Sequence, residues 1–336
     1  MPQLRQNIIT GDWVVIAPER AKRPNEFVIP QSVKITDKSK CPFCPGSAGY
    51  KKNEKVHRAN TENIIVIENK YPAFLENESK SQIRSYYVEG SFYRARPSVG
   101  DHEVVIIKNH SLSLMTFDKN IMTEMFQVIK QRYDYMKQEK GVVSIMPIYN
   151  HGAEAGASID HPHAQIFASG IVANAVGKEM DGAERYYGVN GSCVFCDIIS
   201  HEKKEKIRVI LENEDFIATT AYSARFPMET WIFPKRHQSQ FETVSNSELS
   251  SLAQILITIV RNLETNIPNV PLNWYIHTLP TTHTGSSSYH WHLEITPRLA
   301  NYGGFELGSG IIIDIMSPED SAEYLRKPEA GKGDQK

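Results

Sequence analysis

The sequence has almost no net charge and no long apolar run. Its 336 residues include 37 Lys and Arg against 39 Asp and Glu, which gives a formal charge of −2. Proteins that bind nucleic acid or anionic membranes through overall charge carry a positive excess, so we expect neither partner. No stretch reaches the roughly 18 apolar residues of a membrane span. The N-terminal "MPQLRQNIITGDWVVIAPER" also lacks the apolar core of a signal peptide, so we expect a cytoplasmic protein.

Cysteine is also scarce. The four cysteines form two pairs, Cys41 with Cys44 in "CPFC" and Cys193 with Cys196 in "CVFC". In a reducing compartment disulfides are disfavoured, and a Cys-x-x-Cys pair then indicates half of a metal site or a redox pair. For either pair taken alone, two buried thiols without a function are an equally good explanation.

The chain repeats one order of landmarks. After "CPFC" come a β-branched run ending at His110, a helical pattern with Asp118 as N-cap and Gly141 as its end, a strand, a small-residue loop and "HPHAQI". After "CVFC" come a strand ending at His237, a helix capped by Ser245 or Ser247, a strand, a polar loop and "HWHLEI". The repetition predicts two similar α+β halves, residues 1–180 and 181–325, followed by a disordered polar tail, 326–336.

The spacing within the repeat predicts a metal site in each half. The interval from His110 to His161 is 161 − 110 = 51 residues, and that from His237 to His290 is 290 − 237 = 53. Two thiolates with two imidazoles form a closed tetrahedral zinc set, which leaves no position for substrate and is therefore structural. The two sets are Cys41, Cys44, His110 and His161, and Cys193, Cys196, His237 and His290. In the second set His292 could replace His290, and a site without zinc would return "CPFC" to the thiol–disulfide reading.

The second histidine of "HPHAQI" has a different expected role. Residues two apart on a strand face the same side, so His163 projects beside His161 without being needed for the metal. A free imidazole on a rigid strand suits a nucleophile. Gln165 faces the same way, and its neutral amide can donate to a phosphate oxygen.

The loop before these histidines contains Gly152, Gly156 and Ser158. Successive backbone N–H groups at glycines can hold an anion, and Ser158 could add a hydroxyl. A tight turn that contacts no ligand is the alternative. In the second half Glu294 stands where Gln165 stands in the first, and its carboxylate would repel a phosphate. We therefore expect chemistry in the first half alone, with His292 packed or hydrogen-bonded.

These residues resemble the galactose-1-phosphate uridylyltransferase branch of the histidine-triad superfamily over nearly the whole chain. The resemblance rests on "TGDWVVIAPERAKRPNEF", "CPFC", "VIENKYPAF", "HPHAQIFA", "PKRH" and "GGFELGSG" followed by "SPED". It implies two tandem histidine-triad-like halves, each an antiparallel sheet with helices, related by a pseudo-two-fold axis. It also implies a homodimer and two-step transfer through a covalent nucleotidyl-histidine.

The resemblance also assigns roles to individual residues. His163 matches the nucleophile, Gln165 the residue that holds the phosphate oxygens, and His161 a zinc ligand whose carbonyl orients the nucleophilic ring. Ser158 and Asn150 match polar supporting residues. The positions that match nucleotide contacts are Arg20, Arg23 and Asn69.

Three functions stay open. The leading hypothesis is transfer from UDP-glucose to galactose-1-phosphate, and the alternative is an ADP-glucose phosphorylase with inorganic phosphate as acceptor. The complete second Cys–His set, "AGAS" and "GGFELGSG" are similar to the plant ADP-glucose phosphorylases, whereas Glu294 and Thr296 stand where bacterial members carry a further His-x-His metal set. A zinc-stabilised nucleotide-binding protein without turnover is the third hypothesis.

Overall fold

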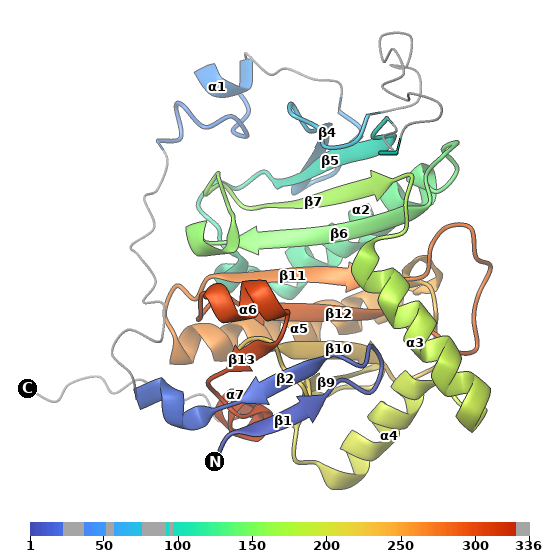
Figure 1. The fold of residues 1–336 in the computed structure, drawn as a ribbon. Coiled ribbons are helices and arrows are strands. Elements are labelled where there is room, and N and C mark those ends of the chain that lie inside the picture. The colour runs from blue at the N-terminus through green and yellow to red at the C-terminus, as the bar shows by residue number, and fades with distance from the viewer. Residues whose placement is uncertain (23–36, 52–56, 76–91, 94–96, 327–336) are drawn as a thin grey trace, which may run out of the picture.

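One ten-stranded antiparallel sheet runs through the whole molecule in a computed structural model that describes residues 1–22, 37–51, 57–75, 92–93 and 97–326 (Figure 1). Its strand order is β3-β4-β5-β7-β6-β11-β12-β10-β9-β8. The strands are β3 (Ala59–Asn60), β4 (Ile64–Glu68), β5 (Gly100–Ile107), β6 (Ser144–His151), β7 (His163–Ser169), β8 (Val209–Glu212), β9 (Phe216–Thr220), β10 (Thr230–Pro234), β11 (Leu272–His277) and β12 (His292–Pro297).

The strand order shows that both halves of the chain have the same arrangement of five strands. The first half contributes β3-β4-β5-β7-β6, and the second contributes β8-β9-β10-β12-β11 in the mirrored direction. The halves meet where β6 pairs antiparallel with β11, with Asn150 opposite Asn273. This confirms the expected α+β fold of two antiparallel units, but the units share one sheet. The sheet ends at β3, two residues long, and at β8, whose pairing with β9 shifts register between Val209 and Leu211.

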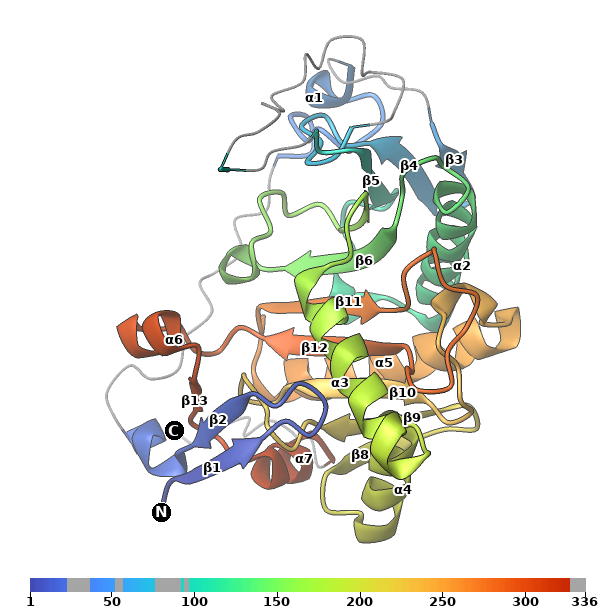
Figure 2. The same cartoon turned by 45° about the vertical axis from the view of Figure 1, so that its right-hand side comes forward.

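Two long helices cover one face of the sheet (Figure 2). Helix α2 (Lys119–Met136) begins at its N-cap Asp118, whose side chain accepts from the Ile121 N–H, and ends before the expected Gly141. Helix α5 (Asn246–Asn266) begins at Ser245, which forms a capping box with Glu248. The apolar sides of both helices and the inward residues of strands from both halves form a single hydrophobic core.

The other face carries shorter elements around the two histidine strands. Helices α3 (Asn174–Asn190) and α4 (Val194–Glu205) cross the second half, and a three-stranded sheet lies beside them (Figure 1). The small sheet consists of β1 (Gln3–Gln6), β2 (Trp13–Ile16) and β13 (Ile312–Asp314). Two short helices are α1 (Ala48–Lys51) and α6 (Gly304–Ser309), whereas α7 (Pro318–Arg326) packs against α5 and joins the hydrophobic core. Among the described residues no helix is both long and apolar enough to cross a membrane.

Candidate active site and metal centres

The first Cys–His cluster joins a loop to two strand ends. Sγ of Cys44 lies 3.1 Å from Nδ1 of His110, and both Cys41 and Cys44 have Sγ 3.4 Å from Nδ1 of His161. The ring of His161 is fixed by its other nitrogen, because Nε2–H donates to the carbonyl of Ile107 over 2.6 Å. The lone pair of Nδ1 therefore faces the thiols. Metal-bound histidines commonly donate their other ring N–H in this way, which fixes the ring for the metal.

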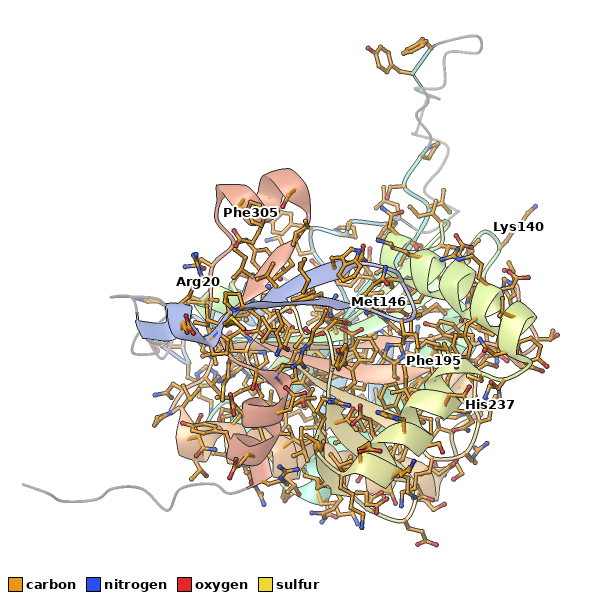
Figure 3. The ribbon with its side chains drawn as sticks, turned by 60° about the horizontal axis from the view of Figure 1, so that its bottom comes forward. Arg20, Lys140, Met146, Phe195, His237 and Phe305 are labelled. Carbon is orange, nitrogen blue, oxygen red and sulfur yellow. The ribbon has the colours of Figure 1, made fainter. Side chains whose placement is uncertain are left out.

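The second cluster repeats this arrangement. Sγ of Cys196 lies 3.3 Å from Nδ1 of His237 and 3.6 Å from Nδ1 of His290, and Cys193 completes the set. The Nε2–H of His290 donates to the carbonyl of Pro234, which stands on β10 where Ile107 stands on β5. Figure 3 shows His237 beside the start of α4, where the second cysteine pair lies.

Both clusters fit a zinc ion. In each, the four nitrogen and sulfur atoms lie within 4.8 Å of one another. Thiolate and imidazole are the ligands that zinc prefers, and a four-ligand set is the closed structural type. Zinc bound here would supply folding energy and fix the ends of β7 and β12. The second set uses His290, whereas His292 takes part in a different network.

His163 is the first residue of β7 and is 7 % exposed. Its Nδ1–H donates to the carbonyl of His161 over 2.7 Å, so the lone pair of Nε2 stays available on the far side of the ring. Burial lowers the pKa of His163, although the hydrogen bond to His161 opposes this, so the ring is neutral at neutral pH. The ring of Phe43, between the two cysteines of "CPFC", packs edge-on against His163 with centroids 5.0 Å apart.

Three of the polar residues expected near His163 share its face of the sheet. Gln165 pairs with Ile148 across β6 and β7, which also places Asn150 on this face. The Oδ1 of Asn150 accepts from Nδ2 of Asn273 over 2.8 Å. Asn69 follows β4, and its N–H donates to the carbonyl of His102 on β5.

The expected loop and arginine residues lie further out. Ser158 is exposed in the loop before β7, after a 3-10 turn whose flanking Gly152 and Gly156 both have φ of +84°. Arg20 lies in the 3-10 turn Pro18–Lys22 after β2, next to the small sheet, and is labelled in Figure 3. Arg23 is outside the described residues.

A third buried cluster was missed by sequence reasoning. Glu179, His277, His292 and Glu294 place their ligand atoms within 4.8 Å of one another. Nδ1 of His277 lies 2.9 Å from Glu179, and Nε2 of His292 lies 3.4 Å from Glu294. A carboxylate therefore faces the nitrogen that would correspond to the nucleophilic one of His163. The signal in the sequence is Glu179 itself, an acidic residue among the buried positions of α3.

Charge in this cluster is balanced by protein groups. Arg225 forms ion pairs with Glu294 and Glu229. Burial alone would raise the pKa of Glu294, but Arg225 and His277 hold it well below its ordinary range. Burial would lower the pKa of His277, but Glu179 and Glu294 raise it above its ordinary value. The arrangement holds charge in place, and it buries His292 completely.

Two family models match the chain, one after the other. A family model described as galactose-1-phosphate uridyl transferase, N-terminal domain, matches residues 1–173. The model of the C-terminal domain of the same enzyme matches residues 179–326. The chain belongs to the galactose-1-phosphate uridylyltransferase family.

Two relatives within this family differ in their named reaction. ADP-glucose phosphorylase from Arabidopsis thaliana is 33% identical over 334 residues, covering 97% of this chain and 93% of the relative. Galactose-1-phosphate uridylyltransferase from Thermotoga maritima is 26% identical over 338 residues, covering 98% and 99%. Both relatives cover nearly the whole chain, but their names give different substrates.

Solved structures repeat the pattern. A crystal structure of the Arabidopsis thaliana ADP-glucose phosphorylase with bound ADP-glucose has a TM-score of 0.81 at 31% identity and covers 97% of this chain and 99% of its own. A structure titled uridylyltransferase has a TM-score of 0.75 at 24% identity, covering 97% of both chains, and shows the same fold.

Proposed function

We propose that this protein is a hexose-1-phosphate nucleotidylyltransferase with His163 as its nucleophile. One observation carries the proposal: the Nδ1–H of His163 is bound to the His161 carbonyl, which leaves Nε2 as the basic, attacking nitrogen. The matched histidine of the second half, His292, has Glu294 at that nitrogen instead. Two similar strands thus differ at the atom where the chemistry would occur.

The reaction would proceed in two displacements. Nε2 of His163 attacks the α-phosphorus of a nucleotide sugar, the N–P bond forms, and the P–O bond to the leaving hexose-1-phosphate breaks. An oxygen of the acceptor phosphate then attacks the same phosphorus and the N–P bond breaks, which restores the neutral imidazole. Gln165 would donate to the phosphate oxygens, with Asn150 and Ser158 as polar neighbours and Asn69 on the nucleotide side.

The first donor and acceptor to test are UDP-glucose and galactose-1-phosphate, in accordance with the family models. A second pair, ADP-glucose and inorganic phosphate, is favoured by a specific observation. The relative at 33% identity over nearly the whole chain is an ADP-glucose phosphorylase, and a structure of that enzyme holds ADP-glucose. Both pairs use the same attack at the α-phosphorus.

The proposal includes two structural zinc ions in each chain. It also includes a cytoplasmic homodimer, in which each chain consists of an N-terminal half, residues 1–180, and a C-terminal half, residues 181–325. The zinc sets are the two Cys–His clusters, whose thiols need a reducing compartment to stay unpaired. The dimer is supported by Arg20, which matches a nucleotide contact yet follows β2 of the small sheet, whereas His163 lies on β7 of the ten-stranded sheet. Residues of both subunits would then complete each site, and co-expressed Arg20→Ala and His163→Ala chains would regain activity in mixed dimers.

The testing experiment is intact-protein mass spectrometry after brief incubation with UDP-glucose or, separately, ADP-glucose, without acceptor. A nucleotidyl adduct that peptide mapping places on His163 supports the proposal, and the donor that labels identifies the base. Bound nucleotide sugar without any covalent adduct, at full zinc content, would instead support the binding protein without turnover.

A further inference from the structure

His102, which sequence reasoning did not select, contacts Gln165 directly. Its Nε2 lies 2.9 Å from Oε1 of Gln165 on the neighbouring strand β7. The ring of His102 stacks on Phe167 with centroids 3.9 Å apart and 27° between the planes, and the residue is 5 % exposed. The imidazole is therefore held in one orientation beside the amide.

The surrounding groups decide which nitrogen of His102 carries the proton. The backbone N–H of Ala73 points at Nδ1 over 3.2 Å, so Nδ1 must accept and Nε2 must be protonated. Nδ2 of Asn69 also lies 3.2 Å from Nε2, but it is a donor, and a protonated Nε2 has no lone pair to accept from it. The amide oxygen of Asn69 accepts from the N–H of Tyr71 instead. Gln165 is thus the one acceptor among these groups, and Nε2–H donates to its Oε1.

This hydrogen bond fixes the direction of the Gln165 amide. Its carbonyl oxygen is turned to His102, so the NH₂ group points the other way, and the described part of the chain offers that NH₂ no acceptor. A flipped amide would present a carbonyl oxygen to the substrate phosphate, which is repulsive, instead of two N–H donors.

We propose that His102 is a positioning residue that orients Gln165 so that the amide donates to the transferred phosphoryl group. The inference rests on the proposed function of His163 and adds to it a residue outside the expected site. His102 does not touch the reacting atoms and acts through Gln165, in the same way that outer-shell partners orient the groups that contact a substrate or metal.

The second half carries a different pair at the same two positions. Glu229 precedes β10 at the place of His102, since each lies two residues before the residue that pairs with Gln165 or Glu294. Arg225 there bridges Glu229 and Glu294. In the first half, where Nε2 of His163 is free, the two positions hold the neutral pair His102 and Gln165. In the second half, where Glu294 faces Nε2 of His292, they belong to an ion-pair network.

The test compares two amide substitutions of His102. In His102→Gln the amide nitrogen reaches the place of Nε2 and keeps the donor, whereas in His102→Asn it reaches only the place of Nδ1. We expect His102→Asn to slow single-turnover nucleotidylation of His163 by about tenfold or more at saturating donor, with a much smaller change in KM. We expect His102→Gln to stay within about threefold of the wild type.

A double-mutant cycle separates positioning from a general structural role. In a Gln165→Ala background, His102→Asn should cost less than about twofold, because its effect passes through Gln165. Equal losses in both backgrounds, or no loss in the wild-type background, would overturn the proposal. Melting temperature and zinc content of each variant identify those that fail to fold, and His102→Gln then supplies the comparison.

A second readout does not depend on turnover. In protein labelled with ¹⁵N-histidine, two-bond ¹H–¹⁵N spectra should show His102 with Nε2 protonated and Nδ1 bare, assigned by loss of the signal in His102→Gln. The opposite tautomer would overturn the inference whatever the activity. If wild-type protein takes no nucleotidyl group from any sugar nucleotide, the proposed function fails, and the tautomer still decides whether His102 holds Gln165.

Discussion

Nδ1 of His163 lies 2.7 Å from the carbonyl oxygen of His161, so one hydrogen bond joins a candidate zinc ligand to the candidate nucleophile. Phe43 adds a second connection, since it sits between the two cysteines of the first cluster and packs on both histidine rings. The first Cys–His cluster therefore orients the His163 imidazole in two ways, by the hydrogen bond to Nδ1 and by the packing of Phe43.

His163→Ala is expected to lower the transfer rate by at least about a thousandfold, because the variant lacks the imidazole nitrogen that would attack phosphorus. Melting temperature and zinc content should not change. His283→Ala, which removes an exposed histidine from a distant loop, is the matched control. Substantial residual transfer by His163→Ala would take the nucleophilic role away from this residue.

Cys41→Ser is expected to lower the zinc content by one ion per chain and the melting temperature by at least about 5 °C, since metal binding contributes to folding. Displacement of Phe43 from the His163 ring should also slow nucleotidylation, by less than the loss of His163 itself. Zinc analysis and calorimetry on the same sample check this. An unchanged melting temperature with full zinc content would contradict it.

Gln165→Glu would place the second half's carboxylate in the first half. We expect nucleotidylation to slow by about a hundredfold or more, because a negative charge replaces a donor beside the phosphate. Gln165→Met is the control, because it removes the hydrogen bonds and adds no charge. Rapid-quench rates should rank wild type, Met and Glu in descending order, and a Glu variant faster than the Met variant would refute the electrostatic argument.

Zinc analysis should find two ions per chain in the wild type, one for each Cys–His cluster. In the Glu179 cluster, Glu294 is paired with Arg225 and Glu179 with His277, so Glu294→Gln should leave the count at two. Cys193→Ser should lower it to one. A third ion that disappears in Glu294→Gln would show that the Glu179 cluster binds metal as well.

Glu103 supplies a pH-dependent contribution to stability. It is fully buried on β5 with Arg132 as its partner, and burial raises its pKa from 4.5 to about 7 despite that arginine. A carboxyl with a raised folded-state pKa stabilises fully below the unfolded value and loses this contribution as the pH rises through about 7.

The free energy of unfolding of the wild type, relative to Glu103→Gln, should therefore fall between about pH 5 and pH 8, by up to about 3 kcal/mol. Urea titrations at fixed zinc concentration measure this difference. A difference that stays constant or grows with pH would mean that Glu103 is ionised throughout in the folded protein.

Sequence reasoning reached the parts of the site that have short, chemically specific spacing. The Cys-x-x-Cys and His-x-His motifs indicated which side chains would meet, because metal ligation needs those residue types and strand geometry fixes which of them share a face. Asp118 and Ser245 marked the helix starts for a similarly local reason.

The rest depended on long-range pairing that no local pattern encodes. The halves share one sheet because the edge strands β6 and β11 pair with each other. The alternation of apolar and polar residues along a strand is the same whether two halves form one sheet or two. His102 and Gln165 are 63 residues apart and meet through the register of β5 on β7. Glu179 joins His277 only because α3 crosses the second half at that point.

The two edge strands of the ten-stranded sheet disfavour association with further chains by strand pairing. An exposed strand edge is a template for further strands, yet here one edge is the two-residue β3 and the other is β8, interrupted by its register shift. Neither offers a long, regular row of hydrogen-bonding groups. Addition of a strand from a second chain is therefore disfavoured at both ends of this sheet, and the homodimer proposed above would form through other surfaces.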